Sequence, residues 1–463
     1  MPTAARINFA DILSGFRGCF TAPAFVRFII LLVGWILTCD PSGGSCVTGA
    51  LVAAQVSGRL HWEAFHRFFS RDRWDLDRLG REVLRLLEPL LLSSWIEVAI
   101  DDTVARKRGG HVFGASMHVD AVTSTKKRRN LVRGHCWVEL GVVINVPWSR
   151  RGWFVPLLSR LYRGKAEAGK AYRTKSQLAR EMLDLFLSWL ETDRQVRLLI
   201  DSGYTGKTML RGLPLERVTV FGSLKTNAAL YRPPSPKDRR GSHKKRRGRP
   251  RKKGERLPTP AQIHKSNRQK WQTIRIHVSR RERQKDVLSL KAQWYDVLGA
   301  RTNHVVLIRE DAEKLRVILC TDDALPAEQI VEQGARRWPI EVWNRDVKQC
   351  FGFADSPARS EKAVLRTAPW AALLSGLLVA WFHRVYARGM TAPLPERPWY
   401  VRKQDLSFAD LVRAAQETFQ GVDALEWALK ILGSNPKAFQ KAMEEKNTAR
   451  PHSARTQITA KAA

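Results

Sequence analysis

The chain has 463 residues, of which 44% are hydrophobic, so it is long enough to form more than one hydrophobic core. Lys and Arg number 79 against 44 Asp and Glu, which gives a formal net charge of +35. A surface this basic repels itself without a polyanionic partner. The composition therefore disfavours a protein without a polyanionic partner. The candidate partners are DNA, RNA or an anionic membrane surface.

Two apolar segments decide between a membrane and a nucleic acid. Phe25 to Thr38 is apolar except for Arg27, and it is shorter than the roughly 20 residues that a membrane span needs. The residues before this segment include Asp11 and contain no clear cleavage site, which argues against a secretory signal. Trp370 to Phe382 is shorter still. We therefore predict two buried core helices, in a chain with no membrane association.

Residues 1–90 have apolar side chains at helical spacing and predict a helical region. Beyond it, apolar runs predict strands and a capping box at Thr174 to Gln177 predicts the start of a helix. The predicted strands span Trp95–Thr103, His135–Val146, Gly152–Leu158, Val196–Asp201 and Glu216–Leu224. This order predicts an α/β fold with a mixed sheet flanked by helices.

The next helix of such a sheet is predicted over Leu325 to Phe351, about a hundred residues later. Tyr231 to Pro260 is a loop by composition, and Trp271 to Ile308 alternates like strands, so we predict a β-rich insertion. The predicted parts are a helical region 1–90, an α/β core 91–224, the basic loop and insertion 225–318, the second part of the core 319–390, and C-terminal helices with a disordered tail 391–463.

Six cysteines form no CxxC pair, which predicts reduced thiols rather than a structural zinc site. His118 and His135 are predicted to be core or loop residues rather than metal ligands.

Three acidic positions close predicted strands or begin a predicted helix: Asp101 or Asp102, Asp201, and Glu341. Neighbouring strand ends bring such side chains together, where bare carboxylates repel one another unless cations neutralise them. Mg²⁺ suits this task because it prefers oxygen ligands and is often held by a few carboxylates with substrate phosphates. Two such ions about 3.5–4 Å apart clamp the attacking and leaving oxygens of a phosphodiester, and Mn²⁺ substitutes for them.

Cations surround the third acid. Glu341, Arg345 and Lys348 stand at i, i+4 and i+7, on one face of a helix, and Arg337 precedes Glu341 by one turn. The acid is predicted to hold metal, and the three cations are predicted to hold the phosphates of DNA.

The motifs DDT (101–103), LLIDSGY (198–204) and RRWPIEVWNRDVKQCFG (336–352) resemble, in this order, bacterial insertion-sequence transposases of the DDE type. The last is similar to their signature Y-x-x-R-x-x-x-E-x-x-x-x-x-x-K, with Arg337, Glu341 and Lys348 at three positions and Gly334 in place of the tyrosine. HRFFSR (66–71) and GHCWVEL (134–140) also resemble segments of these proteins.

The resemblance implies an RNase H-like fold and a cut-and-paste transposase. Such an enzyme binds the inverted-repeat ends of its element as double-stranded DNA, cleaves them with two Mg²⁺ ions and joins them to target DNA, which implies a homodimer in the synaptic complex. RNase H-like folds often carry D-G-S or D-G-T at the first acid, which favours Asp101 over Asp102 without deciding between them. The implied location is the bacterial cytoplasm, associated with the nucleoid.

Lys237 to Lys253 holds eleven Lys or Arg in seventeen residues against one Asp. Within it, Arg247, Gly248, Arg249 and Pro250 resemble the core of an AT-hook, which places arginines in the narrow minor groove of A/T-rich DNA. An unstructured polycationic loop is the alternative.

Related transposases stack a flipped base on an aromatic residue of the insertion, and Trp271 and Trp294 lie there, although core packing is the better prediction for both. Two other interpretations stay open for the chain as a whole. It would then be a domesticated, transposase-derived DNA-binding protein without strand-transfer activity, or a stand-alone RNase H-like nuclease.

Overall fold

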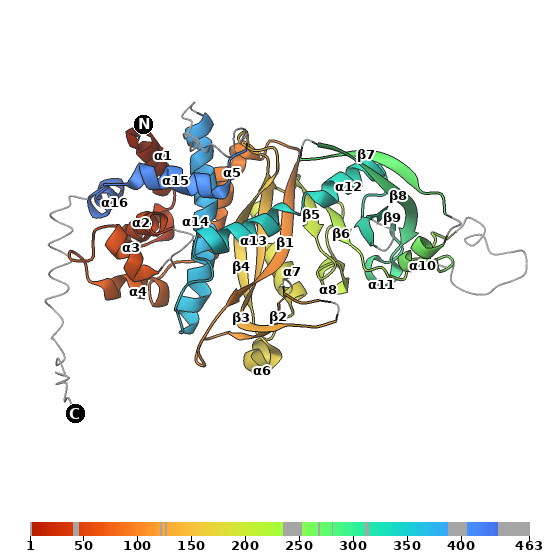
Figure 1. The fold of residues 1–463 in the computed structure, drawn as a ribbon, viewed down its shortest axis with the longest axis horizontal. Coiled ribbons are helices and arrows are strands. Elements are labelled where there is room, and N and C mark those ends of the chain that lie inside the picture. The colour runs from red at the N-terminus through yellow and green to blue at the C-terminus, as the bar shows by residue number, and fades with distance from the viewer. Residues whose placement is uncertain are drawn as a thin grey trace, which may run out of the picture.

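The computed structural model describes residues 2–39, 46–120, 123–125, 127–234, 252–266, 269–279, 281–310, 314–387 and 405–433. Arg247, Gly248, Arg249 and Pro250 lie outside these residues, as does the predicted tail. Figure 1 shows a layer of helices at one end of the molecule, a sheet in the middle, and the continuation of the sheet at the other end.

Within the described residues, ten strands form one mixed sheet in the order β2-β3-β1-β5-β6-β10-β9-β8-β7, with β4 also paired to β3. β1, β5 and β6 are parallel, and the other pairs are antiparallel. The predicted α/β class is confirmed. The strands are β1 (Trp95–Arg106), β2 (Ser116–Val119), β3 (Leu131–Ile144), β4 (Trp153–Tyr162), β5 (Gln195–Ile200), β6 (Val218–Ser223), β7 (Gln272–Val278), β8 (Arg281–Gln293), β9 (Thr302–Arg309) and β10 (Leu315–Cys320).

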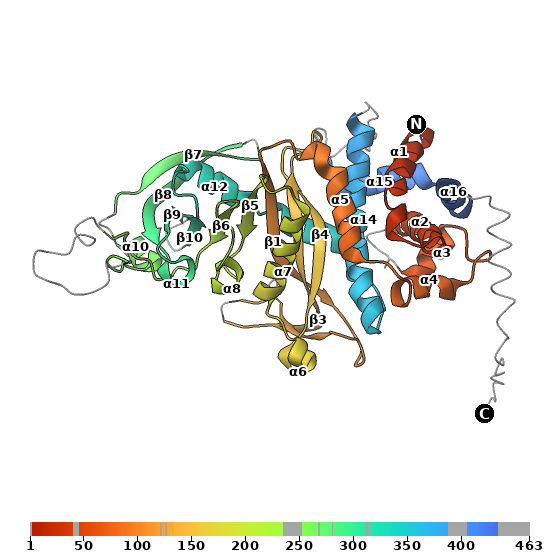
Figure 2. The ribbon, with the colours of Figure 1, turned by 180° about the vertical axis from the view of Figure 1, so that it is seen from behind.

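Helices cover both faces of the sheet. α13 (Pro339–Cys350) crosses the face seen in Figure 1, and α7 (Lys175–Trp189) covers the face seen in Figure 2. α7 begins at the predicted capping box of Thr174 and Gln177. The other helices on or near the sheet are α6 (Lys165–Ala168), α8 (Lys207–Leu210), α10 (Pro260–Lys265), α11 (Tyr295–Leu298) and α12 (Ala327–Ala335).

The helical layer packs around α14 (Glu361–Ala387), which contains the predicted core segment Trp370 to Phe382. α14 is long and apolar enough to cross a membrane, but 89% of its most apolar window is buried inside the protein. The other apolar segment forms the buried helix α2, as predicted. The layer also contains α1 (Pro2–Ser14), α2 (Ala22–Leu37), α3 (Val47–Ala53), α4 (Trp62–Ser70), α5 (Leu76–Leu87), α15 (Phe408–Phe419) and α16 (Ala424–Leu432).

Two predicted boundaries are wrong. The single helix predicted over Leu325 to Phe351 is two helices, because Pro339 lacks the N–H for a continuous helix and instead begins α13. The strand predicted to end at Thr103 continues to Arg106, because β3 pairs with it along that whole stretch. The strands of the predicted insertion extend the central sheet, since β10 pairs with β6.

Arg366 of α14 connects this long helix to the HRFFSR segment of α4 and the residues after it. Its buried guanidinium donates to the backbone carbonyls of Phe68, Phe69, Asp72 and Trp74, at 2.6 to 3.3 Å. These carbonyls end α4 or follow it, where no helical N–H is available to them. The side chain of Arg366 on α14 therefore supplies the hydrogen-bond donors that the carbonyls at the end of α4 lack.

Arg366→Met should lower the free energy of unfolding by about 3 kcal/mol, because it leaves several buried carbonyls without a donor. Arg384→Met, in the last turn of the same helix, is the control. Chemical denaturation of both variants measures the difference, and equal stabilities would show that Arg366 does not hold this layer together.

Candidate functional site

The site forms where the parallel pairing of β1 and β5 ends. The last paired residues are Ile100 and Ile200, so Asp101 and Asp201 are the next residue on each strand. Beyond this point β1 continues beside β3, whereas the chain after β5 turns away. The two carboxylates are close enough for Asp201 to raise the pKa of Asp101.

A tight turn fixes the second acid. Oδ1 of Asp201 accepts hydrogen bonds from the backbone N–H groups of Gly203, at 2.9 Å, and Tyr204, at 3.2 Å. This geometry explains the DSGY sequence, because an aspartate at the start of a turn bonds the backbone two and three residues on.

Arg337 joins the first acid to the third. One of its terminal nitrogens donates to Oδ2 of Asp101 at 2.9 Å, and the other donates to Oε1 of Glu341. Oδ1 of Asp101 accepts from the backbone N–H of Asp102 at 2.8 Å. The structure therefore gathers the predicted Asp101, Asp201, Glu341 and Arg337 from β1, the turn after β5, and the start of α13.

Burial changes the acidity of this group. It raises the pKa of Asp101 to about 7, with Arg337 lowering it and Asp201 raising it. Glu139 of β3 pairs with Asp101 and is fully buried, and burial raises the pKa of Glu139 to about 8. Ser159 donates to Oε2 of Glu139 at 2.6 Å. The face of the sheet beneath α13 therefore strongly disfavours charge.

Asp102 points to the opposite face of the sheet. Lys175 lies 2.6 Å from its Oδ2, and the Tyr204 hydroxyl donates to its Oδ1 at 2.9 Å. The thiol of Cys136 also donates to Oδ2, at 3.2 Å. The alternation along β1 thus separates the two candidates for the first acid. Asp101 faces Arg337 and Asp201, and Asp102 faces α7.

The remaining predicted cations lie elsewhere. Lys348 donates to the backbone carbonyl of Val104 on β1 at 2.8 Å, and burial lowers its pKa. Arg345 is exposed and pairs with the adjacent Asp346 at 2.7 Å. A DNA contact by Lys348 would require it to leave β1, whereas Arg345 is already at the surface.

Packing explains why glycine stands at the tyrosine position of the signature. A Cβ on Gly334 of α12 would lie 2.6 Å from Cδ1 of Ile318 on β10. Arg316, also on β10, donates to the Gly334 carbonyl at 3.0 Å. A larger side chain at this position would have to displace the terminal methyl group of Ile318.

Three residues near the acids escaped the sequence analysis. Trp338, between Arg337 and Glu341, is 61% exposed and presents an aromatic ring at the rim of the site. Glu139 is hidden in an apolar strand, where a carboxylate is itself the signal. Tyr204 is 2% exposed, and its position three residues after Asp201 was the available clue.

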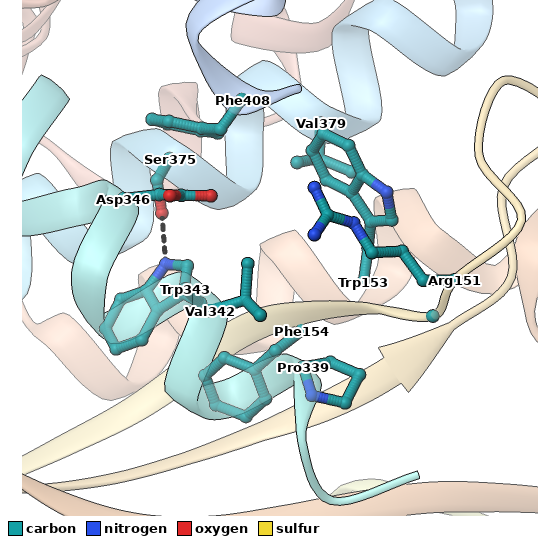
Figure 3. Close-up of a pocket in the computed structure, with 11 residues that line it drawn as sticks. Arg151, Trp153, Phe154, Pro339, Val342, Trp343, Asp346, Ser375, Val379 and Phe408 are labelled. Atoms are coloured by element: carbon teal, nitrogen blue, oxygen red, sulfur yellow. Dashed lines mark hydrogen bonds between the residues drawn. The ribbon is translucent and has the colours of Figure 1, made fainter. Parts of the chain in front are cut away.

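The reverse face of α13 closes on the protein interior. Pro339, Val342, Trp343 and Asp346 line a cavity of about 30 Å³, with residues of β4, α14 and Phe408 on the other sides. In Figure 3 the indole N–H of Trp343 donates to Ser375 of α14, at 3.0 Å. A cavity this small has room for little more than a water molecule. The open side of α13 is the side that carries Glu341.

The donor set suits a hard divalent ion, but its present arrangement does not hold one. Three carboxylates come from three elements, which is the chemistry that Mg²⁺ takes. In the part of the chain that the structure describes, no three Asp, Glu, His or Cys side chains are grouped to bind a metal. Arg337 stands between two of the acids, so the residues fit a metal once this arginine has moved.

A family model for DDE superfamily endonucleases matches residues 16–285. The chain belongs to the DDE superfamily endonucleases. The match includes Asp101, Asp102 and Asp201 and ends before Glu341. Endonucleases of this superfamily generally depend on divalent metal ions.

Among solved structures, the chain is similar to one described as the cryo-EM structure of a piggyBac transposase synaptic complex with hairpin DNA. The TM-score is 0.44 at 11% sequence identity, covering 93% of this chain and 77% of that chain. A search of curated proteins finds no match.

Asp101→Asn should stabilise the metal-free endonuclease in a pH-dependent way. The folded protein holds the Asp101 proton up to about pH 7, whereas the ordinary value is 3.8. The free energy of unfolding of the native protein therefore falls, relative to that of the variant, as pH rises from about 4 to 7. The expected gain at pH 8 is on the order of 3 kcal/mol. Urea denaturation in EDTA at pH 4 to 8 measures it, and a constant difference would contradict the buried, protonated state.

Proposed function

We propose that this endonuclease is the DNA transposase of a cut-and-paste insertion sequence, which binds inverted-repeat ends and catalyses strand cleavage and strand transfer. The observation that carries the proposal is that Arg337 bridges Asp101 and Glu341, with Asp201 close to Asp101. A DNA-binding protein without catalysis gains nothing from gathering these acids, since they repel phosphates.

Asp101, Asp201 and Glu341 would hold the divalent ions, which we propose to be two Mg²⁺ with Mn²⁺ as a substitute. Bound ions supply charge neutralisation at phosphorus and activation of the attacking hydroxyl group. Arg337 changes partner in this proposal, from the two carboxylates to a phosphate of the DNA. A guanidinium binds carboxylate and phosphate oxygens in the same bidentate way, so the exchange preserves its hydrogen bonds.

The surroundings of the acids suit in-line displacement at phosphorus. The buried face beneath α13 excludes water from one side of Asp101. The exposed ring of Trp338 offers a surface on which a nucleobase next to the cleaved bond can stack. The same site serves water in the first cleavage and the freed 3′ hydroxyl in strand transfer, without a covalent enzyme intermediate.

DNA-end recognition is assigned to the N-terminal helices and the basic segment Lys237 to Lys253, in keeping with the net charge of +35. Joining two ends requires a homodimer in the synaptic complex. The proposed location is the bacterial cytoplasm, at the nucleoid.

Glu341→Gln tests the third acid. Duplexes tiled across the DNA that flanks the chain's own coding sequence are incubated with Mg²⁺ or Mn²⁺ and the native or variant protein. The native protein should nick one duplex at the element end. Glutamine keeps the size of the side chain but removes a metal-binding charge, so the variant should bind that duplex equally and cleave it at least 10²-fold more slowly.

Each other outcome has its own meaning. If the native protein binds an end tightly and specifically but never cuts, the chain is a domesticated DNA-binding protein. If Glu341→Gln cleaves at the native rate, Glu341 is not part of the metal site.

Arg337→Gln tests the exchange of partners. Loss of one phosphate contact should lower the slope of log binding constant against log salt concentration by about 0.9. Arg336→Gln is the matched control, because Arg336 binds Glu97 and Asn145 instead of the acids of the site. Fluorescence anisotropy of duplex binding at several salt concentrations gives both slopes. If the two variants have the same slope as the native protein, Arg337 stays on the carboxylates and does not bind DNA.

A further inference from the structure

Asp102 joins four parts of the catalytic core. It belongs to β1 and accepts hydrogen bonds from Cys136 of β3, from Lys175 at the start of α7, and from Tyr204 in the turn after β5. Both of its oxygens are therefore in use, and Lys175 lies 2.6 Å from one of them as a counter-charge. An aspartate in this state is a structural anchor rather than an open metal ligand.

The contact with Tyr204 matters because of where that residue lies. Tyr204 is the third residue after Asp201, and its backbone N–H donates to the Asp201 carboxylate at 3.2 Å. Its hydroxyl crosses to Asp102 at 2.9 Å, and the ring is 2% exposed. One side chain thus connects the turn that holds Asp201 to the strand that holds Asp101.

The other end of this turn is fixed to β6. Thr205 donates to the Asp201 backbone carbonyl at 2.7 Å. Gly222 of β6 leaves the space that Thr205 fills, since a Cβ there would lie 2.6 Å from the threonine Oγ1. The turn is held to β6 by packing and to β1 by the Tyr204 hydroxyl.

We infer that Tyr204 and Asp102 are positioning residues, which set the separation of Asp101 and Asp201 by hydrogen-bonding the turn after β5 to β1. Asp101 and Asp201 must lie at a fixed distance to share an ion, and the parallel pairing stops one residue before them. The Tyr204–Asp102 bond extends the connection between the two strands beyond the last backbone pair. This inference rests on the proposed function, because it assigns metal to Asp101 and Asp201.

Tyr204→Phe removes only the hydroxyl. Loss of a hydrogen bond to a carboxylate should weaken Mn²⁺ binding to the protein–duplex complex about tenfold. The Mg²⁺ concentration for half-maximal cleavage should rise by a similar factor. Duplex affinity in EDTA should match that of Tyr386→Phe, a control that removes a hydroxyl from a ring packed among Trp148 and Phe382. Free Mn²⁺, followed by electron paramagnetic resonance, reports binding independently of cleavage.

Asp102→Asn separates a positioning role from metal binding and serves if Tyr204→Phe fails to fold. Asparagine keeps an oxygen that accepts from Tyr204, so Mn²⁺ binding should stay within about threefold of native. Asp101→Asn should abolish it.

The outcomes distinguish the two proposals. If the native protein neither binds Mn²⁺ in the presence of duplex nor cleaves it, the proposed function is wrong, and this inference is wrong with it. A native protein that does both, beside a Tyr204→Phe variant with native metal affinity, overturns the inference alone. An Asp102→Asn variant as defective as Asp101→Asn overturns it as well, by showing Asp102 to be a ligand.

Discussion

The site depends on where the parallel pairing of β1 and β5 stops. Hydrogen bonding ends at Ile100 and Ile200, and the next residue on each strand is an aspartate. Parallel strands place equivalent residues side by side, so the register brings the two carboxylates near each other, and the turn after β5 then fixes Asp201. β1 then continues beside β3, and this keeps Asp101 in a rigid strand while Asp201 lies in a turn.

The cations of α13 hold the helix to the strand. Arg337 binds Asp101, Lys348 binds the Val104 carbonyl, and Arg336, just before the helix, binds Glu97. These contacts lie at three points along β1. The acid and the cations of this segment therefore have different tasks. Glu341 faces the other acids, and the neighbouring cations determine how far Glu341 lies from β1.

Sequence patterns predicted several strands and the candidate acids, because a local run of residues marks each of them. Apolar runs located β1, β3, β4, β5 and β6, and the order of the three acidic motifs indicated the site. Two features could not be read this way. The choice between Asp101 and Asp102 depends on which face α13 covers, and the role of Lys348 depends on the distance from its helix to β1. Gly334 likewise departs from the motif, and the structure shows that α12 packs closely against Ile318 at this position.

In the proposed function, charge balance couples DNA binding to metal binding at this site. Three ionised carboxylates and Arg337 sum to −2, which one divalent ion neutralises, and burial of Asp101 works against even this charge. A second ion would leave a charge of +2 in a region that disfavours charge, unless phosphate oxygens arrive with it. If a phosphate also takes Arg337 away from Asp101 and Glu341, the sum at the carboxylates becomes −3 and the phosphate supplies a further negative charge. The acids are therefore best neutralised by two ions when DNA is in place, and the guanidinium neutralises part of their charge until then.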